Sequence, residues 1–286
     1  MVPVSHSFDC ADFFGLLAVR RIAIPYPLQP ATQLLEEDIA ARRQDVAAAD
    51  HEADAWVRRL EPVVAACADH RASLDLRYAE EGRETGAVVL FGDRPTCWLI
   101  GCTGPTGRAT EVPSDRAVAA LLELLPPRRA VEFAPVTLPE QALDAIGSAS
   151  ATDSDRERIA RAAGTNLDAV RSALASVGAS TGAGQIGALV RSPQGDAVRS
   201  TSLVVVVDGA TGRLLRLSGT APGGQRLASL APGTAAAVHR AAAELLTATS
   251  QLAAGQVRSP SLSDQQGRGQ QGRADRPPNR TAGAPR

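Results

Sequence analysis

The chain repeats one order of structural signals in its two halves, and this repetition constrains the fold more than any single residue does. Each half has a short apolar segment ended by proline, at residues 22–28 and 131–138, followed by a helical stretch and then by strand-like segments. Each half closes with a helix that a proline opens, at Pro113 and at Pro232, 119 positions apart. The repetition predicts one pseudo-symmetric body built from two similar units.

In the first half, helices are predicted before a run of strands. Asp9 or Asp12 is the candidate cap of a short first helix. Helical periodicity covers residues 32–70, and a break at 47–50 divides it into two helices. The other elements expected here are strands at 21–26, 73–80, 86–91 and 96–102 and a helix from Ser114. The turn at 92–95 predicts that the last two strands form an antiparallel hairpin.

The second half repeats this plan. Helices are expected at 138–146, 153–163 and 165–177, the last opened by a capping box of Thr165 and Asp168. Strands are expected at 131–136, 185–191, 197–208 and 213–218, before the closing helix. Because Leu203–Val207 lacks polar alternation, this strand is predicted to be central and covered on both faces.

From about residue 253 the chain is polar, rich in Gly, Gln, Arg and Pro, with hardly an apolar residue. Such a segment buries too little surface to offset the entropy of ordering it. Residues 251–286 are therefore predicted to be a disordered tail.

The residues that carry catalysis, metals or cofactors in proteins are not arranged here in a recognised pattern. The chain has no lysine, no GxSxG or HExxH motif, and four cysteines without CxxC spacing. Gly182–Gly187 matches GxGxxG, but a helix precedes it and a strand follows, which reverses the order of a dinucleotide site. A flexible connection is the predicted use of these glycines, and no catalytic residue, metal site or cofactor is expected.

Charge and hydropathy exclude other classes of function. The formal net charge is −1, which argues against a general nucleic-acid-binding protein. The sequence contains no run of eighteen apolar residues, so no membrane-spanning helix is expected. The first residues lack the pattern of a secretory signal, so a cytoplasmic protein is expected.

Three segments resemble the EspG family of chaperones from actinobacterial type VII (ESX) secretion systems. They are Phe13–Leu17 followed by Ile24–Leu28, the strand Leu74–Tyr78 after two helices, and the stretch from Leu203 to Val238. The resemblance covers roughly residues 8–248. It implies an α+β fold whose two quasi-twofold halves, 8–127 and 128–250, form one domain with a shared antiparallel sheet flanked by helical bundles.

The resemblance also implies a function. EspG proteins are non-enzymatic cytosolic chaperones that bind secreted helical PE–PPE pairs and keep them soluble for export, so PE/PPE-like partners are expected here. Without a substrate, a monomer or a weak dimer is expected. The predicted contact surface is the central sheet with the C-terminal helices, and its candidate residues are Trp98, Ile100, Arg199, Thr201 and Leu203. Alternation sends Trp98 and Ile100 to one face of their strand, where core packing is the default and an interface role is the alternative.

A second reading stays open at this point. An enzyme or a small-molecule-binding protein could use a cleft between the two halves, through the glycine run at 182–187.

Overall fold

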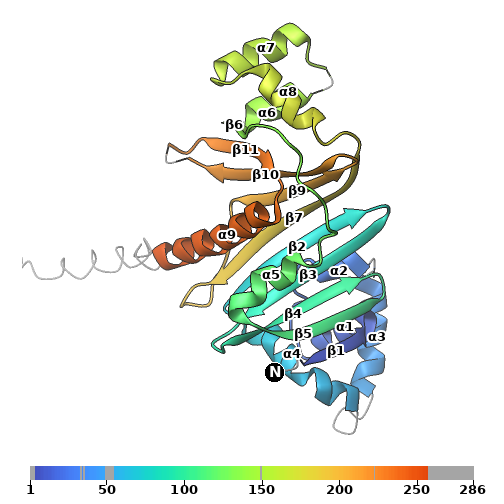
Figure 1. Cartoon of the computed structure of the whole chain (residues 1–286). Helices are drawn as coiled ribbons and strands as arrows, with labels where there is room; N and C mark the ends of the chain where they lie inside the picture. Colours follow the sequence, from blue (N-terminus) through green and yellow to red (C-terminus); the bar gives the residue numbers. More distant parts are fainter. Residues whose placement is uncertain are drawn as a thin grey trace, which may run out of the picture.

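A computed structural model of the chain describes residues 4–32, 34, 36–48, 55–148, 150–221 and 223–256. One long antiparallel sheet crosses the molecule, with helices packed against both of its faces (Figure 1). The fold is therefore of the α+β class, as predicted.

The first half contributes the strands from one edge of the sheet to its middle. Its strands are β1 (Ser5–Asp9), β2 (Ala72–Glu80), β3 (Arg83–Phe91), β4 (Thr96–Thr103) and β5 (Thr106–Pro113). Its helices are α1 (Cys10–Val19), α2 (Leu28–Thr32), α3 (Glu36–Ala48), α4 (Ala55–Asp69) and α5 (Ala117–Leu122), with the 3-10 turn η1 (Ser114–Arg116) before α5. Asp9 caps α1 by accepting hydrogen bonds from the backbone N–H groups of Ala11 and Asp12, at 2.9 and 3.2 Å.

The second half has the same order of elements. It contains β6 (Val136–Pro139), α6 (Glu140–Gly147), α7 (Asp153–Ala162), α8 (Leu167–Ala175), β7 (Ser180–Arg191), β8 (Ala197–Arg199), β9 (Leu203–Gly209), β10 (Gly212–Thr220), β11 (Arg226–Pro232) and α9 (Ala235–Gln256). The predicted hairpin turn at 92–95 is confirmed, and a second hairpin joins β9 to β10. α3 continues through Ala48, and the rest of the break predicted at 47–50 lies outside the described residues.

The two halves meet at an antiparallel seam between β2 and β7, where Ala72 lies opposite Val190 and Glu80 opposite Gly182. The strand order is β1-β5-β4-β3-β2-β7-β9-β10-β11-β6, and β8 pairs with β7 off this path. Counted outward from the seam, each strand on this path therefore has a counterpart in the other half, and β8 has none among the described strands. The repeated unit begins at β1 and β6, not at residues 22–28 and 131–138, because β1 and β6 are the equivalent outer strands.

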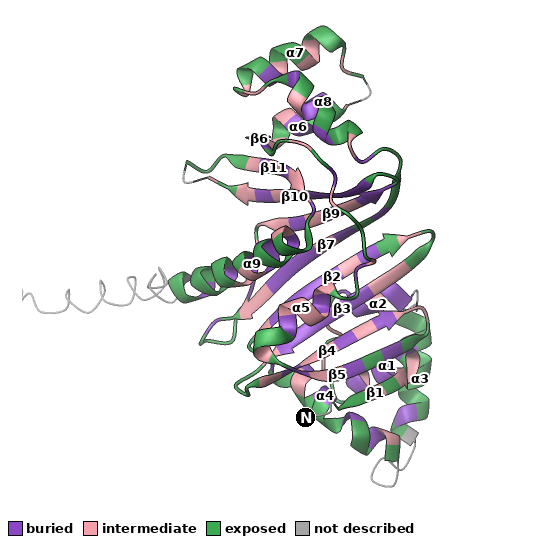
Figure 2. Cartoon of the chain, viewed as in Figure 1, coloured by how far each residue is buried: buried purple, intermediate pink, exposed green. Residues whose placement is uncertain are grey.

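The helices divide between the two faces of the sheet. We call the face of the sheet that carries α5 and α9 the front face, and the opposite face the back face (Figure 1). On the front face, α5 and α9 cover the middle of the sheet, where Val238, Ala242 and Leu245 pack with Ile186 and other strand residues. On the back face, α1–α4 cover the first half and α6–α8 cover the outer strands of the second half, as two separate clusters. Figure 2 shows buried residues gathered on the middle strands of the sheet, including β2, β3 and β7, and many exposed residues on α7.

Two predicted strands are wrong, and proline is the reason in both. Residues 22–25 have no regular structure, since Pro25 and Pro27 lack the N–H group that a ladder needs and Arg21 has a positive φ of 58°. Residues 131–135 are also irregular, and only Ala130 forms a bridge, to Arg213. The strand of this segment begins after Pro135, at Val136.

Other boundaries differ from the predictions. The strand expected at 197–208 is split into β8 and β9, because Ser200 turns away after bonding both backbone groups of Ala188. Asn166, not Thr165, caps α8. β1, β5 and β11 were not predicted. α9 continues past residue 250 to Gln256, with Ala253 buried, and the rest of the predicted tail lies outside the described residues.

β9 is fully covered on one face and only partly covered on the other, which corrects the prediction for Leu203–Val207. Val204 and Val206 are buried beneath α9 on the front face. On the back face, Val207 packs against the helical cluster of the second half. Leu203 and Val205 are partly exposed and belong to neither back-face cluster, because the helices of the two halves lie to either side of them. This gap in the helical cover makes the middle of the back face the candidate functional site.

Candidate functional site

The uncovered part of the back face runs along the seam between the halves. Its residues are cross-strand neighbours: Asp75 lies opposite Gly187, Ser73 opposite Leu189, and Gln185 opposite Val205. None of these side chains belongs to the three buried apolar clusters. We call this surface the central strip and define it by Ser73, Asp75, Arg77, Gln185, Gly187, Leu189, Arg199, Leu203, Val205 and Arg216.

An ion pair lies in the middle of the central strip. Arg199 Nη2 donates to both carboxylate oxygens of Asp75, at 3.0 and 3.1 Å. Asp75 is 1% exposed, whereas the Arg199 side chain is 42% exposed and its guanidinium lies 4.8 Å from the centre of the Tyr26 ring. Burial raises the pKa of Asp75, and Arg199 opposes that rise. The arginine thus neutralises a buried carboxylate while one side of it faces solvent.

Gly187 makes room for this pair. A Cβ at residue 187 would lie 2.8 Å from Arg199 Nη2 and 2.9 Å from Asp75 Oδ1, which is closer than real side chains approach. Two other glycines of the run, Gly182 and Gly184, face the opposite side of β7, where they lie against the Tyr78 ring. The run is therefore inside a strand and not in the flexible connection that was predicted, and side chains of β2 fill the space above it.

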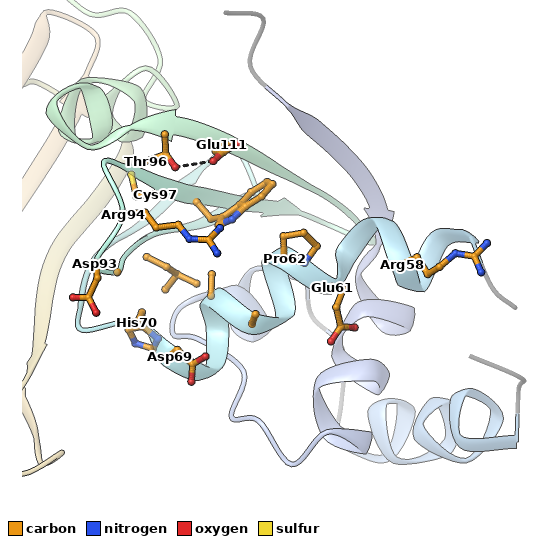
Figure 3. Close-up of a pocket in the computed structure, with 15 residues that line it drawn as sticks. Arg58, Glu61, Pro62, Asp69, His70, Asp93, Arg94, Thr96, Cys97 and Glu111 are labelled. Carbon is orange, nitrogen blue, oxygen red and sulfur yellow. Dashed lines mark hydrogen bonds between the residues drawn. The ribbon is translucent and has the colours of Figure 1, made fainter. Parts of the chain in front are cut away.

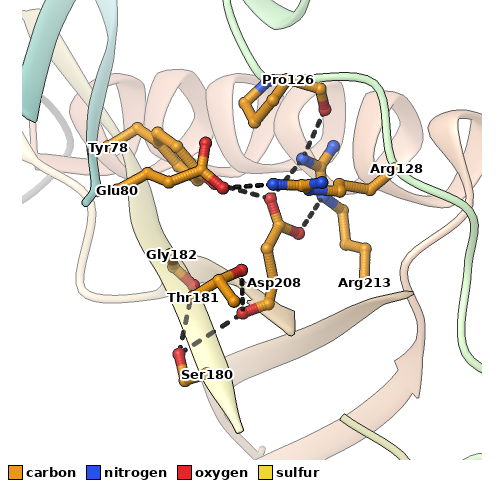
Figure 4. A network of polar contacts seen from close by, with 9 residues as sticks. All are labelled: Tyr78, Glu80, Pro126, Arg128, Ser180, Thr181, Gly182, Asp208 and Arg213. Carbon is orange, nitrogen blue, oxygen red and sulfur yellow. Dashed lines mark hydrogen bonds and ion pairs between the residues drawn. The ribbon is translucent and has the colours of Figure 1, made fainter. Parts of the chain in front are cut away.

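Tyr78, whose ring lies on the front face, belongs to a buried polar network that joins the two halves (Figure 4). Tyr78 Oη donates to Asp208 Oδ2 at 2.7 Å, and Arg213 donates to both Asp208 oxygens, at 2.6 and 2.7 Å. Arg213 Nη2 also donates to the carbonyl of Pro126, in the segment between the halves, at 2.9 Å. Burial and the bond to Asp208 raise the pKa of Tyr78. This network fixes β9 and β10 against β2 beneath the central strip.

The rims of the central strip are also anchored by polar contacts. On the first-half side, Gln185 Nε2 donates to Tyr26 Oη at 2.9 Å. On the second-half side, Glu140 in the first turn of α6 accepts bonds from Arg226, Ser218 and Arg216, at 2.5, 3.0 and 3.1 Å. The bond from Arg226 is the main reason that the pKa of Glu140 is lowered. These contacts hold the loop before α2 and the start of α6 on opposite sides of the strip.

The structure divides the five predicted site residues into two groups. Arg199 and Leu203 lie on the central strip, and Thr201 is exposed in the turn that joins β8 to β9. Trp98 and Ile100 lie on β4, which β3 and β2 separate from β7.

Trp98 and Ile100 share one face of β4, as predicted, and that face lies beneath the N-terminal helices. Ile100 is 0% exposed, so it offers no surface to a partner in this structure. Trp98 is partly buried and its ring stacks with His6 at 5.9 Å. Trp98 also lines a pocket of about 540 Å³ between α4 and the turn after β3 (Figure 3). An interface role for Trp98 stays a prediction, separate from the central strip.

Sequence reasoning missed Asp75, Tyr26 and Gln185 as parts of one surface. In β2 the polar Asp75 and Arg77 alternate with Leu74, Leu76 and Tyr78, a pattern typical of a solvent-facing side, yet Asp75 is almost fully buried. The available signal was Gly187, since a glycine inside a strand indicates the close approach of another group.

The described residues include neither a candidate membrane-spanning helix nor a candidate cluster of metal ligands. No helix there is both long and apolar enough to cross a membrane. No group of three or more His, Cys, Asp or Glu side chains there has an arrangement that could hold a metal ion.

Comparison with known proteins identifies the family. The model of the EspG family matches residues 18–244. Fourteen chains of solved structures match. One of them is the Mycobacterium tuberculosis type VII secretion system chaperone EspG5 in complex with a PE25–PPE41 dimer, with a TM-score of 0.60 at 13% identity, over 85% of this chain and 95% of that one. The search of curated proteins returned no match. Since the family match spans most of its length, from the end of α1 into α9, the chain belongs to the EspG family.

Proposed function

We propose that this chain is a non-enzymatic chaperone of a type VII secretion system, which binds a PE/PPE-like helical pair in the cytoplasm and keeps it soluble for export. Membership of the EspG family supports the proposal, and so does the solved EspG5 structure of the same fold, which contains a PE25–PPE41 dimer. The observation that carries it is the central strip, a part of the sheet that the helices of neither half cover.

The chemistry of the central strip suits a protein partner. Leu189, Leu203 and Val205 give it partly exposed apolar surface, and Arg199 and Gln185 give it donors that are held in place by Asp75 and Tyr26. Arginine and aromatic residues held in this way are typical of interface hot spots. The halves 8–127 and 128–250 would act as one domain, because each supplies part of the strip, and the unbound chain would be a monomer or a weak dimer.

Co-expression tests this proposal. The chain is produced with each secreted helical pair encoded beside its gene, and complexes are detected by affinity purification and size-exclusion chromatography. We expect one stoichiometric complex. Thr201→Arg, at the exposed turn beside the strip, should weaken it. Thr247→Arg, on the exposed side of α9 across the sheet, should leave it intact. Absence of a complex between the wild-type chain and every such pair would overturn the proposal.

A further inference from the structure

A cavity of about 370 Å³ adjoins the central strip at the end of β7, beside the loop that connects α1 to α2. Its walls are partly apolar, with Ile22 and Ile24 from the loop and Leu189 from β7. Its charged side chains are all arginines: Arg21, Arg191 and Arg199. We call this site the basic cavity.

The three arginines come from distant parts of the chain. Arg21 follows the end of α1 and has a φ of 58°, which turns the chain into the loop. Arg191 ends β7, where its backbone N–H donates to the carbonyl of Arg71 at 2.7 Å. Arg199 lies on β8, paired in register with Leu189. The sheet and one loop thus bring three positive charges to the same cavity.

The charge of the basic cavity is not balanced within it. No Asp or Glu is among the described residues that line it, and the nearest carboxylate in contact is Asp75, which Arg199 engages through Nη2. Arg21 and Arg191 form no ion pair within the described ranges. Since guanidinium carries five N–H donors, Arg199 keeps others for an incoming group. With one carboxylate against three arginines, the site carries an excess positive charge.

His70 also lines the cavity but does not change this conclusion. Its Nδ1 lies 3.0 Å from the carbonyl oxygen of Cys67, and burial lowers its pKa. The nearby charge of Arg191 lowers that pKa further. The lowered pKa disfavours the charged form of the imidazole, so the arginines supply the positive charge of the site.

We propose that the basic cavity receives an aspartate or glutamate side chain of the helical partner, with a neighbouring aliphatic side chain against Ile22, Ile24 and Leu189. This inference rests on the proposed function and specifies the chemistry of its binding surface. A planar guanidinium binds a carboxylate through two parallel hydrogen bonds, and the apolar walls exclude the water that would weaken them. The cavity then selects partners by an acidic residue at one position, while the central strip supplies most of the contact area.

The test uses the full chain and the helical pair that co-purifies with it. Arg21→Gln and Arg191→Gln remove exposed charges and leave the Asp75–Arg199 pair in place. Arg240→Gln removes the same charge from the exposed side of α9, across the sheet, and is the matched control. Affinity is measured by titration calorimetry at low and high salt, and thermal melting shows that each variant is folded.

We expect each cavity variant to bind the pair roughly tenfold or more weakly, the loss expected for one charge-assisted hydrogen bond. Its affinity should also depend less on salt than that of the wild type. In the partner, replacing each exposed Asp or Glu by Asn or Gln should identify one carboxylate whose loss is non-additive with Arg191→Gln.

The outcomes separate this inference from the proposed function. If the wild-type chain and all three variants bind the pair equally well, the function stands and the basic cavity inference is overturned. The inference is also overturned if every partner substitution is additive with Arg191→Gln. If the wild-type chain binds no helical pair, both proposals fall together.

Discussion

Replacing Arg213 by methionine should destabilise the protein more than any conservative change at its surface. The substitution keeps much of the side-chain volume but removes two hydrogen bonds to Asp208 and one to the carbonyl of Pro126. Asp208 is 0% exposed, so water does not replace the lost donors. The carboxylate keeps the hydrogen bond from the Tyr78 hydroxyl, which does not neutralise its charge.

The magnitude follows from this geometry. Breaking a buried ion pair by removing one partner costs about 3–5 kcal/mol. Removing only the Tyr78 hydroxyl, with Tyr78→Phe, deletes one bond while both arginine bonds remain, and should cost roughly 1–2 kcal/mol. Since a domain is stabilised by about 5–15 kcal/mol in total, Arg213→Met alone removes a large share of the stability.

Urea unfolding followed by circular dichroism measures both variants and the double variant Asp208→Asn/Arg213→Met. The double variant has no buried charge and should be more stable than Arg213→Met alone. Two results would refute the reasoning. One is a cost below about 1 kcal/mol for Arg213→Met, the size of one ordinary hydrogen bond. The other is a double variant no more stable than the single one.

Three further predictions concern separate features. Gly182→Ala should lower the free energy of unfolding by about 1–3 kcal/mol because its Cβ would overlap the Tyr78 ring; Gly92→Ala, which meets no atom within 4 Å, is the control, and equal costs would contradict the packing role. The folded-state pKa of Glu140 lies below its ordinary 4.5, so its contribution is complete above that pH and is lost as the pH falls through the folded value. Glu140→Gln should therefore reduce the melting temperature at pH 7 and reduce it progressively less as the pH is lowered below 4.5, and an equal reduction at every pH would argue against the charged contacts. Ile100→Ala should cost about 2–4 kcal/mol of stability and leave partner affinity unchanged in the folded protein, whereas a selective loss of binding would place this residue in the interface.

The elements that the sequence predicted best are those with a strong apolar period. α4 and α8 carry apolar residues at helical spacing, β2 alternates apolar with polar residues, and β3 and β4 are largely apolar; all of them lie close to their expected positions. β1 and β5 lie at one edge of the sheet and contain few apolar residues, without a regular apolar alternation. A strand of this kind is defined by its pairing partner, and pairing is not visible in the local sequence.

The candidate site could be predicted only in part for a related reason. Alternation in β2 assigns Asp75 to one face, but it does not say whether that face is covered. The pair between Asp75 and Arg199 joins residues 124 positions apart, and the register of β2, β7 and β8 brings them together. Arg199 and Leu203 were nevertheless predicted, because the family resemblance directs attention to the central sheet.

The seam between β2 and β7 has a consequence for any attempt to separate the halves. A chain cut between α5 and β6 would expose the full hydrogen-bonding edge of β2, and an open edge of that length invites another strand. The partner that fits this edge by symmetry is a second copy of the same half, paired antiparallel about a twofold axis. We therefore expect an isolated half to self-associate through β2, and the two-unit chain to be the covalent form of such a dimer.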